Sequence, residues 1–408
     1  MEKQKQKKAY RKLETDPIIK GFMFNYYAQS KDLPTGKKIV WVTSGAPVEP
    51  LIAMDLFPLY PENYGAVTGA AREAVNLCQA AENQGYSQDL CSYARNSIGS
   101  LYAGGDSLMG GLTEPDMLVV GNNICGVVLK WFQSISRYYR VPMFVFDTPF
   151  LQGTQEKHHL DYTTQQLEEM IQFVEKHTGQ KFNEKTFEDV VLLSVEAVEL
   201  WSKILESCKT TPSPLNCADR LIAMGPVVCQ RGMEETVNCY EALLEEVQTR
   251  VKDGLGAIYE EKTRLLFDNI PMWFNLYKFF NTLAAKGVVF PADTYTHAWS
   301  TGKIASTDPF TSMAQIYSNV YLNRGLDYKI DLISQLVKDY NCDGFVLHSA
   351  FSCKRYSLGQ PITRRIVQER TKMPGVIIDG DICDSRMFSE EQTWTRLESL
   401  LEIVNSEK

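Results

Sequence analysis

The strongest constraint on the fold is a set of short apolar runs, rich in β-branched and aromatic residues, that alternate with helical stretches. In the first part of the chain these runs are 38–43 (KIVWVT), 116–121 (DMLVVG) and 142–146 (PMFVF). In the last part they are 263–268 (TRLLFD), 287–291 (GVVFP), 344–347 (GFVL) and 375–378 (GVII). Short runs of this kind between helices are typical of buried strands in parallel sheets. The sequence therefore predicts an α/β fold with two Rossmann- or flavodoxin-like parallel-sheet domains.

The stretch between the two sets of runs has a different pattern, because it is long, amphipathic and rich in interleaved acidic and basic residues. This pattern predicts a helical section between the two sheets. We expect a basic N-terminal arm at 1–16, a first α/β domain at 17–158, the helical section at 159–257 and a second α/β domain at 258–408. The arm has the composition of a solvated or partner-packed tail, and we assign no function to it.

Two cysteines follow predicted strands, which places both at the mouth of a sheet. Cys125 comes just after the run 116–121, and Cys353 follows a later run after a short loop. In open parallel sheets the loops after the carboxyl ends of strands bind ligands and cofactors, so these two thiols suggest a shared metal. Cys91 lies near the start of a helix within the helical pattern 70–102, where the helix dipole favours a thiolate. Spacing alone leaves open whether these thiols are metal ligands or ordinary buried side chains.

Charge and hydropathy exclude several classes of partner. With 42 basic and 50 acidic residues the net charge is −8, which argues against nucleic-acid binding. The first residues, MEKQKQKKAYRK, lack the apolar core of a signal peptide, and no apolar run is long enough to span a bilayer. We therefore expect a cytoplasmic protein whose ten cysteines are reduced, most of them buried in the core.

Two local patterns resemble binding motifs without meeting their requirements. The glycines of 102–112 (YAGGDSLMGGL) follow a helix and lack the strand–GxGxxG–helix order, so they predict a flexible loop. His158 and His159 open a helical segment with no cysteine or carboxylate at ligand spacing, which predicts a capping or surface pair.

Several segments resemble the 2-hydroxyacyl-CoA dehydratase family, which includes benzoyl-CoA reductase subunits. They are TSGAPVEP (43–50), CSYAR (91–95), NNICG (122–126), HSAFSC (348–353) and GDICDSR (380–386), and the resemblance covers nearly the whole chain. It implies that Cys91, Cys125 and Cys353 hold one [4Fe–4S] cluster. Three protein ligands leave one iron open to water, hydroxide or a substrate carbonyl, so that this iron can act as a Lewis acid.

Two further strand-end residues are alternatives near this site. Cys383 also follows a predicted strand and could be a fourth ligand, but the family pattern does not use it. The neighbouring Asp381 and Asp384 disfavour a thiolate there. His348 could orient a ligand or contact a thioester, and a structural role is at least equally consistent with a single histidine at a strand end.

The resemblance implies a catalytic lyase subunit that removes water from an (R)-2-hydroxyacyl-CoA during amino-acid fermentation in an anaerobe. An example is the conversion of 2-hydroxyisocaproyl-CoA to 2-isocaprenoyl-CoA in leucine fermentation. The hydroxyl leaves from C2 while the proton leaves from unactivated C3. One-electron reduction of the carbonyl to a ketyl radical makes this elimination possible, and the electron returns when the product forms.

The resemblance also implies partners and alternatives. The partners are a smaller homologous beta subunit with its own cluster and an ATP-dependent iron–sulfur activator. The chain has no Walker motif, which agrees with ATP being used on another protein. The alternative functions are a phenyllactyl-, lactoyl- or 2-hydroxyglutaryl-CoA dehydratase subunit, an electron-relay subunit of such an enzyme or of a benzoyl-CoA reductase, and a cluster scaffold without activity.

Ser44 and Glu49 match polar positions of the family at the mouth of the first predicted strand. A base for the C3 proton, or a group that orients the hydroxyl, requires a carboxylate or hydroxyl at such a place. For Ser44 a turn or helix-capping role is an equally good interpretation, because Ser-Gly-Ala-Pro is a favourable turn sequence.

The ligand set gives the first prediction. Anaerobically purified protein should contain about four irons per chain. Replacing Cys91, Cys125 or Cys353 by serine should remove most of the iron, whereas Cys383→Ser should retain it. Iron analysis and the visible absorption spectrum measure this. Loss of the cluster in Cys383→Ser together with retention in one of the other three variants would show that the ligand set is wrong.

Overall fold

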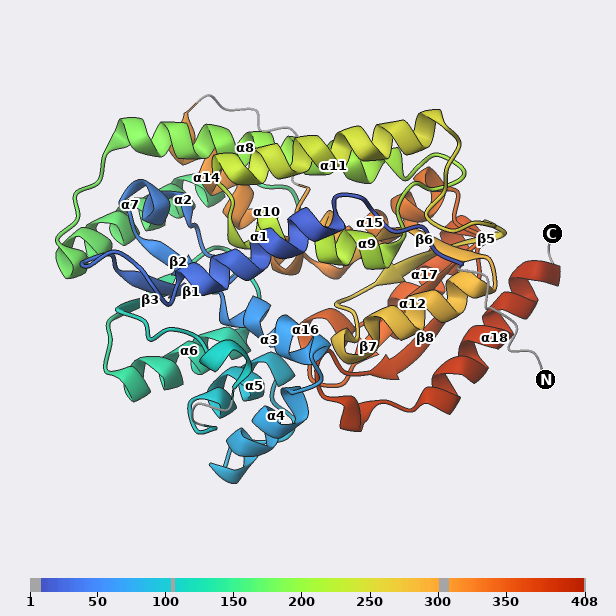
Figure 1. The fold of residues 1–408 in the computed structure, drawn as a ribbon, viewed down its shortest axis with the longest axis horizontal. Helices are drawn as coiled ribbons and strands as arrows, with labels where there is room; N and C mark the ends of the chain where they lie inside the picture. The colour runs from blue at the N-terminus through green and yellow to red at the C-terminus, as the bar shows by residue number, and fades with distance from the viewer. Residues whose placement is uncertain (1–8, 104–106, 301–307, 407–408) are drawn as a thin grey trace.

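The structure, a computed structural model, describes residues 9–103, 107–300 and 308–406, and it contains two four-stranded parallel sheets (Figure 1). The first sheet has the order β2-β1-β3-β4 and consists of β1 (Ile39–Val42), β2 (Phe57–Leu59), β3 (Met117–Gly121) and β4 (Met143–Phe146). The second has the order β6-β5-β7-β8 and consists of β5 (Thr263–Asp268), β6 (Val288–Asp293), β7 (Gly344–Ala350) and β8 (Gly375–Gly380). The predicted α/β fold with two parallel sheets is confirmed.

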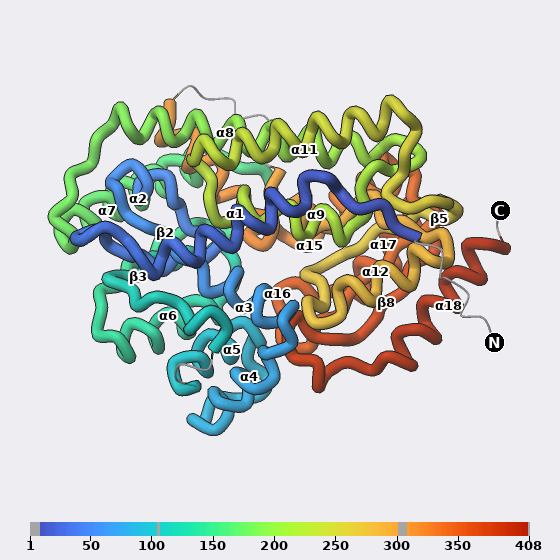
Figure 2. The backbone as a smooth tube through the Cα atoms, viewed as in Figure 1, coloured from blue at the N-terminus to red at the C-terminus, as the bar shows by residue number. Residues whose placement is uncertain are grey.

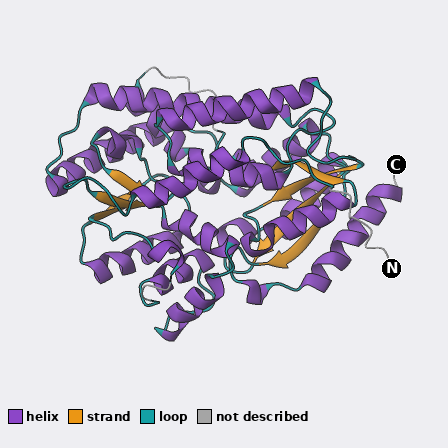
Figure 3. Ribbon diagram, viewed as in Figure 1, coloured by secondary structure: helices purple, strands orange, loops and turns teal. Residues whose placement is uncertain are grey.

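Every predicted strand is present, and helices cover both sheets (Figure 3). Strands β1, β3, β5 and β6 are buried along their whole length, which is typical of parallel sheets with helices on both faces. Strand β2 was not predicted. It has only three residues, which is too short for an alternating pattern to be recognised. A proline at its centre, Pro58, also argues against a strand in the sequence.

Seven helices belong to the first half of the described chain, before the helical section. They are α1 (Asp16–Gln29), α2 (Glu49–Ala53), α3 (Pro61–Ala70), α4 (Ala74–Asn83), α5 (Ser92–Ser100), the short η2 (Leu108–Gly110) and α6 (Gly126–Tyr139). The helical pattern predicted over 70–102 is two helices, because the chain turns between α4 and α5 at Gly85, whose φ is +86°. Cys91 is consequently the residue that caps the start of α5.

The predicted helical section is present between the two sheets. Its members are α7 (Lys157–Thr178), α8 (Glu184–Ser207), α9 (Cys217–Ala223), α10 (Gly225–Cys229) and α11 (Glu234–Lys252). Helices α8 and α11 pack side by side and extend over both sheets (Figure 1). The predicted capping role in the His158–His159 pair is confirmed for His159, whose Nδ1 accepts a hydrogen bond of 2.9 Å from the Glu156 amide at the start of α7.

The helices of the second half include a segment that reaches back over the first half. They are η3 (Trp273–Asn275), α12 (Leu276–Ala285), α13 (Thr294–His297), α14 (Pro309–Ser318), η4 (Tyr321–Asn323), α15 (Leu326–Asp339), α16 (Lys354–Ser357), α17 (Gln360–Thr371), η5 (Ser385–Met387) and α18 (Glu390–Ser406). Helix α14 was not predicted, and it packs on α7 and α8. The two sheets therefore share one continuous hydrophobic core.

The beginning of the described chain also crosses between the halves. Tyr10 forms an antiparallel bridge with Ile258, beside β5, before α1 runs back toward the first sheet (Figure 2). Residues 1–8 of the predicted arm and 104–106 of the glycine-rich loop lie outside the described residues. In the described part of the chain no helix has the length and apolar character required to cross a membrane.

A buried ion pair connects helix α5 to the second sheet. Arg95 Nη1 lies 2.8 Å from Asp384 Oδ2, in the loop after β8, and both side chains have no solvent exposure. Arg95 also contacts Glu82 of α4 at 2.7 Å. Because Arg95 is four residues after Cys91, this pair fixes the helix that carries the first cysteine against the second half of the molecule.

Removal of one partner of this pair should destabilise the protein. Arg95→Met removes one of the two cations that contact Asp384, which keeps Arg386 at 2.6 Å, so the loss of the buried charge-assisted hydrogen bond should cost about 1.5–3 kcal/mol of folding free energy. Arg365→Met is a matched control, because Arg365 pairs with Glu369 on the exposed surface of α17, and it should cost less than about 1 kcal/mol. Urea unfolding compares the two variants, and equal losses would contradict this assignment.

Candidate functional site

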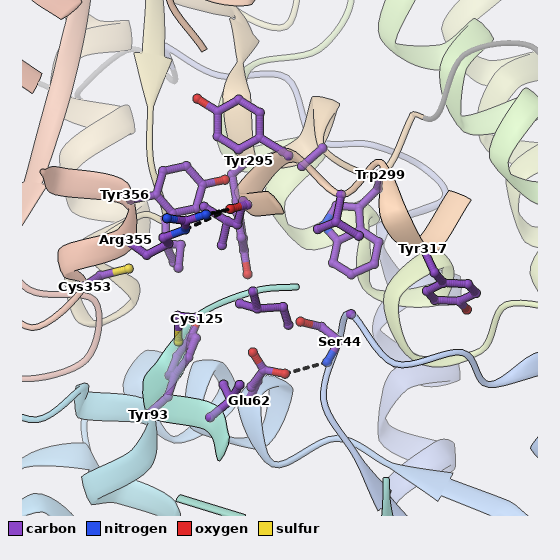
Figure 4. A pocket seen from close by; sticks show the side chains of 18 of the residues that line it. Ser44, Glu62, Tyr93, Cys125, Tyr295, Trp299, Tyr317, Cys353, Arg355 and Tyr356 are labelled. Atoms are coloured by element: carbon purple, nitrogen blue, oxygen red, sulfur yellow. Dashed lines mark hydrogen bonds between the residues drawn. The ribbon is translucent and has the colours of Figure 1, made fainter. Parts of the chain in front are cut away.

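The three predicted cysteine ligands line one cavity of about 1160 Å³, which includes the space open at its mouth. Figure 4 shows two of them, Cys125 and Cys353. Ser44 enters the wall from the end of β1, Cys125 from the loop after β3, Ile270 from the loop after β5 and Cys353 from the loop after β7. Strands β1 and β3 are neighbours in the first sheet, and β5 and β7 are neighbours in the second. The strand order of each sheet reverses between these two strands. Ligands of open parallel sheets bind at such points, and here both points open into the same cavity.

Each of the three cysteines immediately precedes a helix. Cys91 begins α5, Cys125 begins α6 and Cys353 begins α16, so the first-turn amides of each helix lie near the sulfur and favour its thiolate. Burial outweighs this effect. It raises the pKa of all three thiols, that of Cys353 to about 12, and the mutual proximity of the sulfurs raises the pKa of Cys91 further. The metal-free thiols are therefore protonated at neutral pH, and a bound cation is needed to stabilise three thiolates here.

A pair of serines holds the loops of two cysteines together. The amide of Ser92, next to Cys91, donates a hydrogen bond of 3.0 Å to Ser352 Oγ, next to Cys353. The Ser352 amide in turn donates to Asp381 Oδ2 at 3.0 Å. These contacts fix the relative position of two of the sulfurs without any metal, which is the arrangement expected of a prearranged ligand site.

The three thiols suit a cluster of several metal ions better than a single ion. Among the described residues, no group of three or more histidine, cysteine or carboxylate side chains is placed to bind a metal ion. In a four-iron cluster each thiolate binds a different iron, so the sulfurs stand farther apart than the ligands of one ion. Three half-buried thiols around one cavity fit that wider arrangement, and thiolates suit iron–sulfur clusters.

Cys383 and His348 lie outside the cavity. The Cys383 thiol points toward α3, where it donates to the carbonyl of Gly65 at 3.1 Å. His348 is fully buried, its Nδ1 lies 2.7 Å from the Ile270 carbonyl, and burial lowers its pKa. Neither side chain lines the cavity, so the contacts of His348 support a structural role in the second sheet.

Glu62 is a cavity residue that the sequence interpretation missed. It lies in the first turn of α3, and its Oε2 accepts a hydrogen bond of 2.5 Å from the amide of Ser44 (Figure 4). Burial raises the pKa of Glu62 to about 7, although the hydrogen bonds from Ser44 oppose this shift. A carboxyl group that titrates near neutral pH can accept and release a proton in the same catalytic cycle.

Glu49 also lines the cavity, but its two oxygens already have partners. It is 1% exposed, and it accepts hydrogen bonds of 2.6 Å from Ser194 Oγ and 2.5 Å from Tyr317 Oη. Arg231 Nε lies 3.7 Å from Oε1 and adds an opposite charge. The assignment of Glu49 as a base stays a prediction. Its contacts are those of a residue that fixes the cavity wall.

Much of the cavity wall is apolar. Its apolar side chains include Val198, Trp299, Ile316 and Val320. Arg231 lies over the rings of Trp299, at 5.5 Å, and Tyr317, at 5.3 Å, and Glu49 balances its charge. This end of the cavity is suited to an uncharged hydrocarbon group, because a carboxylate placed there would meet Glu49 as well as Arg231.

Comparison with known proteins gives a consistent set of relatives. The family model described as 2-hydroxyglutaryl-CoA dehydratase, D-component, matches residues 43–404. The chain is 35% identical to the (R)-2-hydroxyisocaproyl-CoA dehydratase alpha subunit of Clostridioides difficile, over 97% of this chain and 98% of that protein. It is 29% identical to the lactoyl-CoA dehydratase subunit alpha of Anaerotignum propionicum, over 91% and 92%. It is also 29% identical to the (R)-phenyllactyl-CoA dehydratase alpha subunit of Clostridium sporogenes, over 91% of each chain.

The raised pKa of Glu62 makes a prediction about stability. The folded protein retains the Glu62 proton up to about pH 7, whereas the ordinary value is 4.5. The free energy of unfolding of the wild type should therefore fall relative to that of Glu62→Gln as the pH rises from 4.5 to about 7, and the difference should be level outside this range. Urea unfolding of the metal-free proteins at successive pH values measures this. A difference that stays constant across the range would contradict the raised pKa.

Proposed function

Because the chain belongs to the family of the 2-hydroxyglutaryl-CoA dehydratase D-component, we propose that it is the catalytic subunit of an enzyme that dehydrates (R)-2-hydroxyacyl-CoA. It is a hydro-lyase of the 2-hydroxyacyl-CoA dehydratase type. The observation that carries the catalytic role is the single cavity in which three cysteines, Ser44 and Glu62 meet. A pure electron-relay subunit has no need for an acid–base group in the cavity that its cysteines line.

We propose that Cys91, Cys125 and Cys353 hold a [4Fe–4S] cluster with one iron free of protein ligands. When bound, such a cluster supplies a Lewis-acidic iron and the single electron required for the ketyl-radical route to the enoyl product. The position of the three half-buried thiols in one cavity supports this ligand set. The exclusion of Cys383 from the cavity agrees with a fourth iron position that is left to substrate.

The side chains beside the cysteines have separate tasks in this proposal. Glu62 takes the C3 proton of the substrate, and its raised pKa lets it hold that proton until the product leaves. Ser44 keeps the Glu62 carboxylate in place through its amide. None of the described residues that line the cysteine cavity is exposed, so the wall shields reactive intermediates from solvent on every side that these residues cover.

We propose a branched hydrocarbon acyl group, as in 2-hydroxyisocaproyl-CoA, for the apolar end of the cavity. The relative at 35% identity has this substrate in its name, and the apolar wall with a balanced Arg231–Glu49 pair supports the same class. A phenyllactyl group is also apolar and is the nearest alternative. A lactoyl group leaves much of the apolar wall uncovered, and the second carboxylate of a 2-hydroxyglutaryl group is disfavoured by Glu49.

The partner proteins follow from the relatives. Proteins named alpha subunits function with another subunit, so this chain has a partner subunit. We propose that this partner is a smaller homologous beta subunit with its own cluster, and that a separate ATP-dependent activator injects the electron. Amino-acid fermentation in an anaerobe is the metabolic setting that this chemistry suits.

The role of Glu62 can be tested by its amide variant. Glu62→Gln retains the shape of the side chain but cannot accept a proton, so turnover should fall by roughly a hundredfold or more while the iron content is unchanged. Ser44→Ala keeps the amide that binds Glu62 but removes the hydrogen bond of the Ser44 hydroxyl to the same carboxyl group, and it should cost about 1–3 kcal/mol of transition-state stabilisation. Steady-state rates of the anaerobic complex with activator and ATP measure both effects.

Glu49→Gln is the matched control, since both glutamates line the same cavity. It leaves Arg231 without its full counter-charge, so its main effect should be a lower melting temperature, with a smaller loss of turnover in the protein that remains folded. The opposite pattern, a large loss of turnover in folded Glu49→Gln and near-normal turnover in Glu62→Gln, would assign the proton transfer to Glu49. Near-normal turnover in both variants would favour the relay function.

A further inference from the structure

The wall of the cysteine cavity has an unbalanced positive charge. Four of its described side chains are ionisable acids or cations: Glu49, Glu62, Arg231 and Arg355. Glu49 Oε1 and Arg231 Nε lie 3.7 Å apart, so these two charges balance each other. Burial raises the pKa of Glu62 to about 7, so this group is largely uncharged below that pH. Arg355 forms no ion pair with any residue that the structure describes, and its charge therefore has no counter-ion.

Several contacts hold the Arg355 side chain in one place. It is half-buried in α16, and its Nε and Nη2 atoms donate hydrogen bonds of 2.8 Å and 2.5 Å to the Leu322 carbonyl. Its guanidinium group also lies 4.6 Å from the centre of the Phe150 ring. Figure 4 shows this group on the same side of the cavity as the sulfurs of Cys125 and Cys353. The charge is therefore fixed beside two of the three proposed cluster ligands.

The other charged groups near Cys353 have partners of their own. Lys329 lies behind Arg355, where its Nζ donates a hydrogen bond of 3.3 Å to the Arg355 carbonyl. Burial lowers the pKa of Lys329 to about 8, and the neighbouring Asp268 offsets part of its charge. Asp381 accepts hydrogen bonds from three backbone amides, which offset its negative charge. Neither Lys329 nor Asp381 lines the cavity, so Arg355 is the charge that faces the sulfurs without compensation.

We propose that Arg355 balances the charge of the iron–sulfur cluster and raises its reduction potential. An oxidised cluster core carries about two positive charges and three thiolates about three negative ones, so the occupied site has a net charge of about −1. One added electron makes this charge more negative, and a fixed cation in a half-buried site favours that state. Arg355 therefore makes it easier for the cluster to accept an electron. The inference rests on the proposed function, because it presumes a cluster at the three cysteines.

Two substitutions separate the charge of Arg355 from its hydrogen bonds. Arg355→Gln keeps a donor for the Leu322 carbonyl but removes the charge. At the midpoint potential of the wild type its ratio of reduced to oxidised cluster should fall about tenfold, which is a shift of about 59 mV for a one-electron couple. Arg355→Lys keeps the charge but lacks the planar fork, and its ratio should stay within about threefold of the wild type. Anaerobic redox titration of the iron-loaded proteins, followed by electron paramagnetic resonance, measures these ratios.

Lys354→Gln is the matched control, because it removes the same charge from the residue next to Cys353. Lys354 is exposed, and its Nζ lies 4.6 Å from the centre of the Phe351 ring. Water and salt screen an exposed charge, so the ratio of reduced to oxidised cluster should change by less than about threefold.

Iron content keeps the test decisive if a variant does not retain the cluster. Loss of iron in Arg355→Gln together with normal iron in Arg355→Lys would support the charge balance, because only the charge separates the two. An unchanged ratio in Arg355→Gln would overturn the inference. Equal shifts, or equal losses of iron, in both variants would also overturn it, since that pattern belongs to a structural role. A wild type that binds no cluster under anaerobic conditions would overturn the proposed function itself.

Discussion

The buried contact between Arg95 and Asp384 is the interaction on which the geometry of the site depends. Two charges removed from water are unfavourable unless they pair closely, so this contact permits only one arrangement of helix α5 against the second sheet. The hydrogen bond from Ser92 to Ser352 lies beside it and joins the loops of Cys91 and Cys353. The sulfurs of Cys91 and Cys353, which belong to opposite halves of the chain, are thereby held at a fixed relative position before any cofactor binds.

The two sheets contribute to the site through their strand order. In the first sheet β1 and β3 are the two central strands, and in the second sheet β5 and β7 are. From the two central strands of each sheet the chain continues to opposite edges of that sheet. The resulting crevices face each other, with Cys125 and Cys353 at their edges. Apolar surroundings keep the metal-free thiols protonated and neutral, because burial raises their pKa values, so three thiolates form in this site only when cations are bound. The same surroundings provide a dry cavity for chemistry on an acyl thioester.

Much of this arrangement could be predicted from sequence, and the exceptions have physical reasons. Cys125 and Cys353 follow long β-branched runs, so their place at the strand ends was visible. Glu62 was missed because it follows β2, whose three residues carry no periodicity. Tyr317 comes from α14, which was not predicted, and its contact with Glu49 joins residues far apart in the sequence. Local patterns reveal elements, whereas contacts between distant segments appear only when the fold is known.

The central claim is that the three cysteines present an iron atom to a CoA thioester within this cavity. Mössbauer spectroscopy of the anaerobic, iron-57-labelled protein tests it most directly, by comparing spectra recorded with and without a 2-hydroxyacyl-CoA. The account predicts that one of about four iron sites is distinct and shifts when the ester is added, because that site alone lacks a protein thiolate. Four equivalent sites that do not respond to the ester would contradict an open iron and, with it, the catalytic role of this cavity.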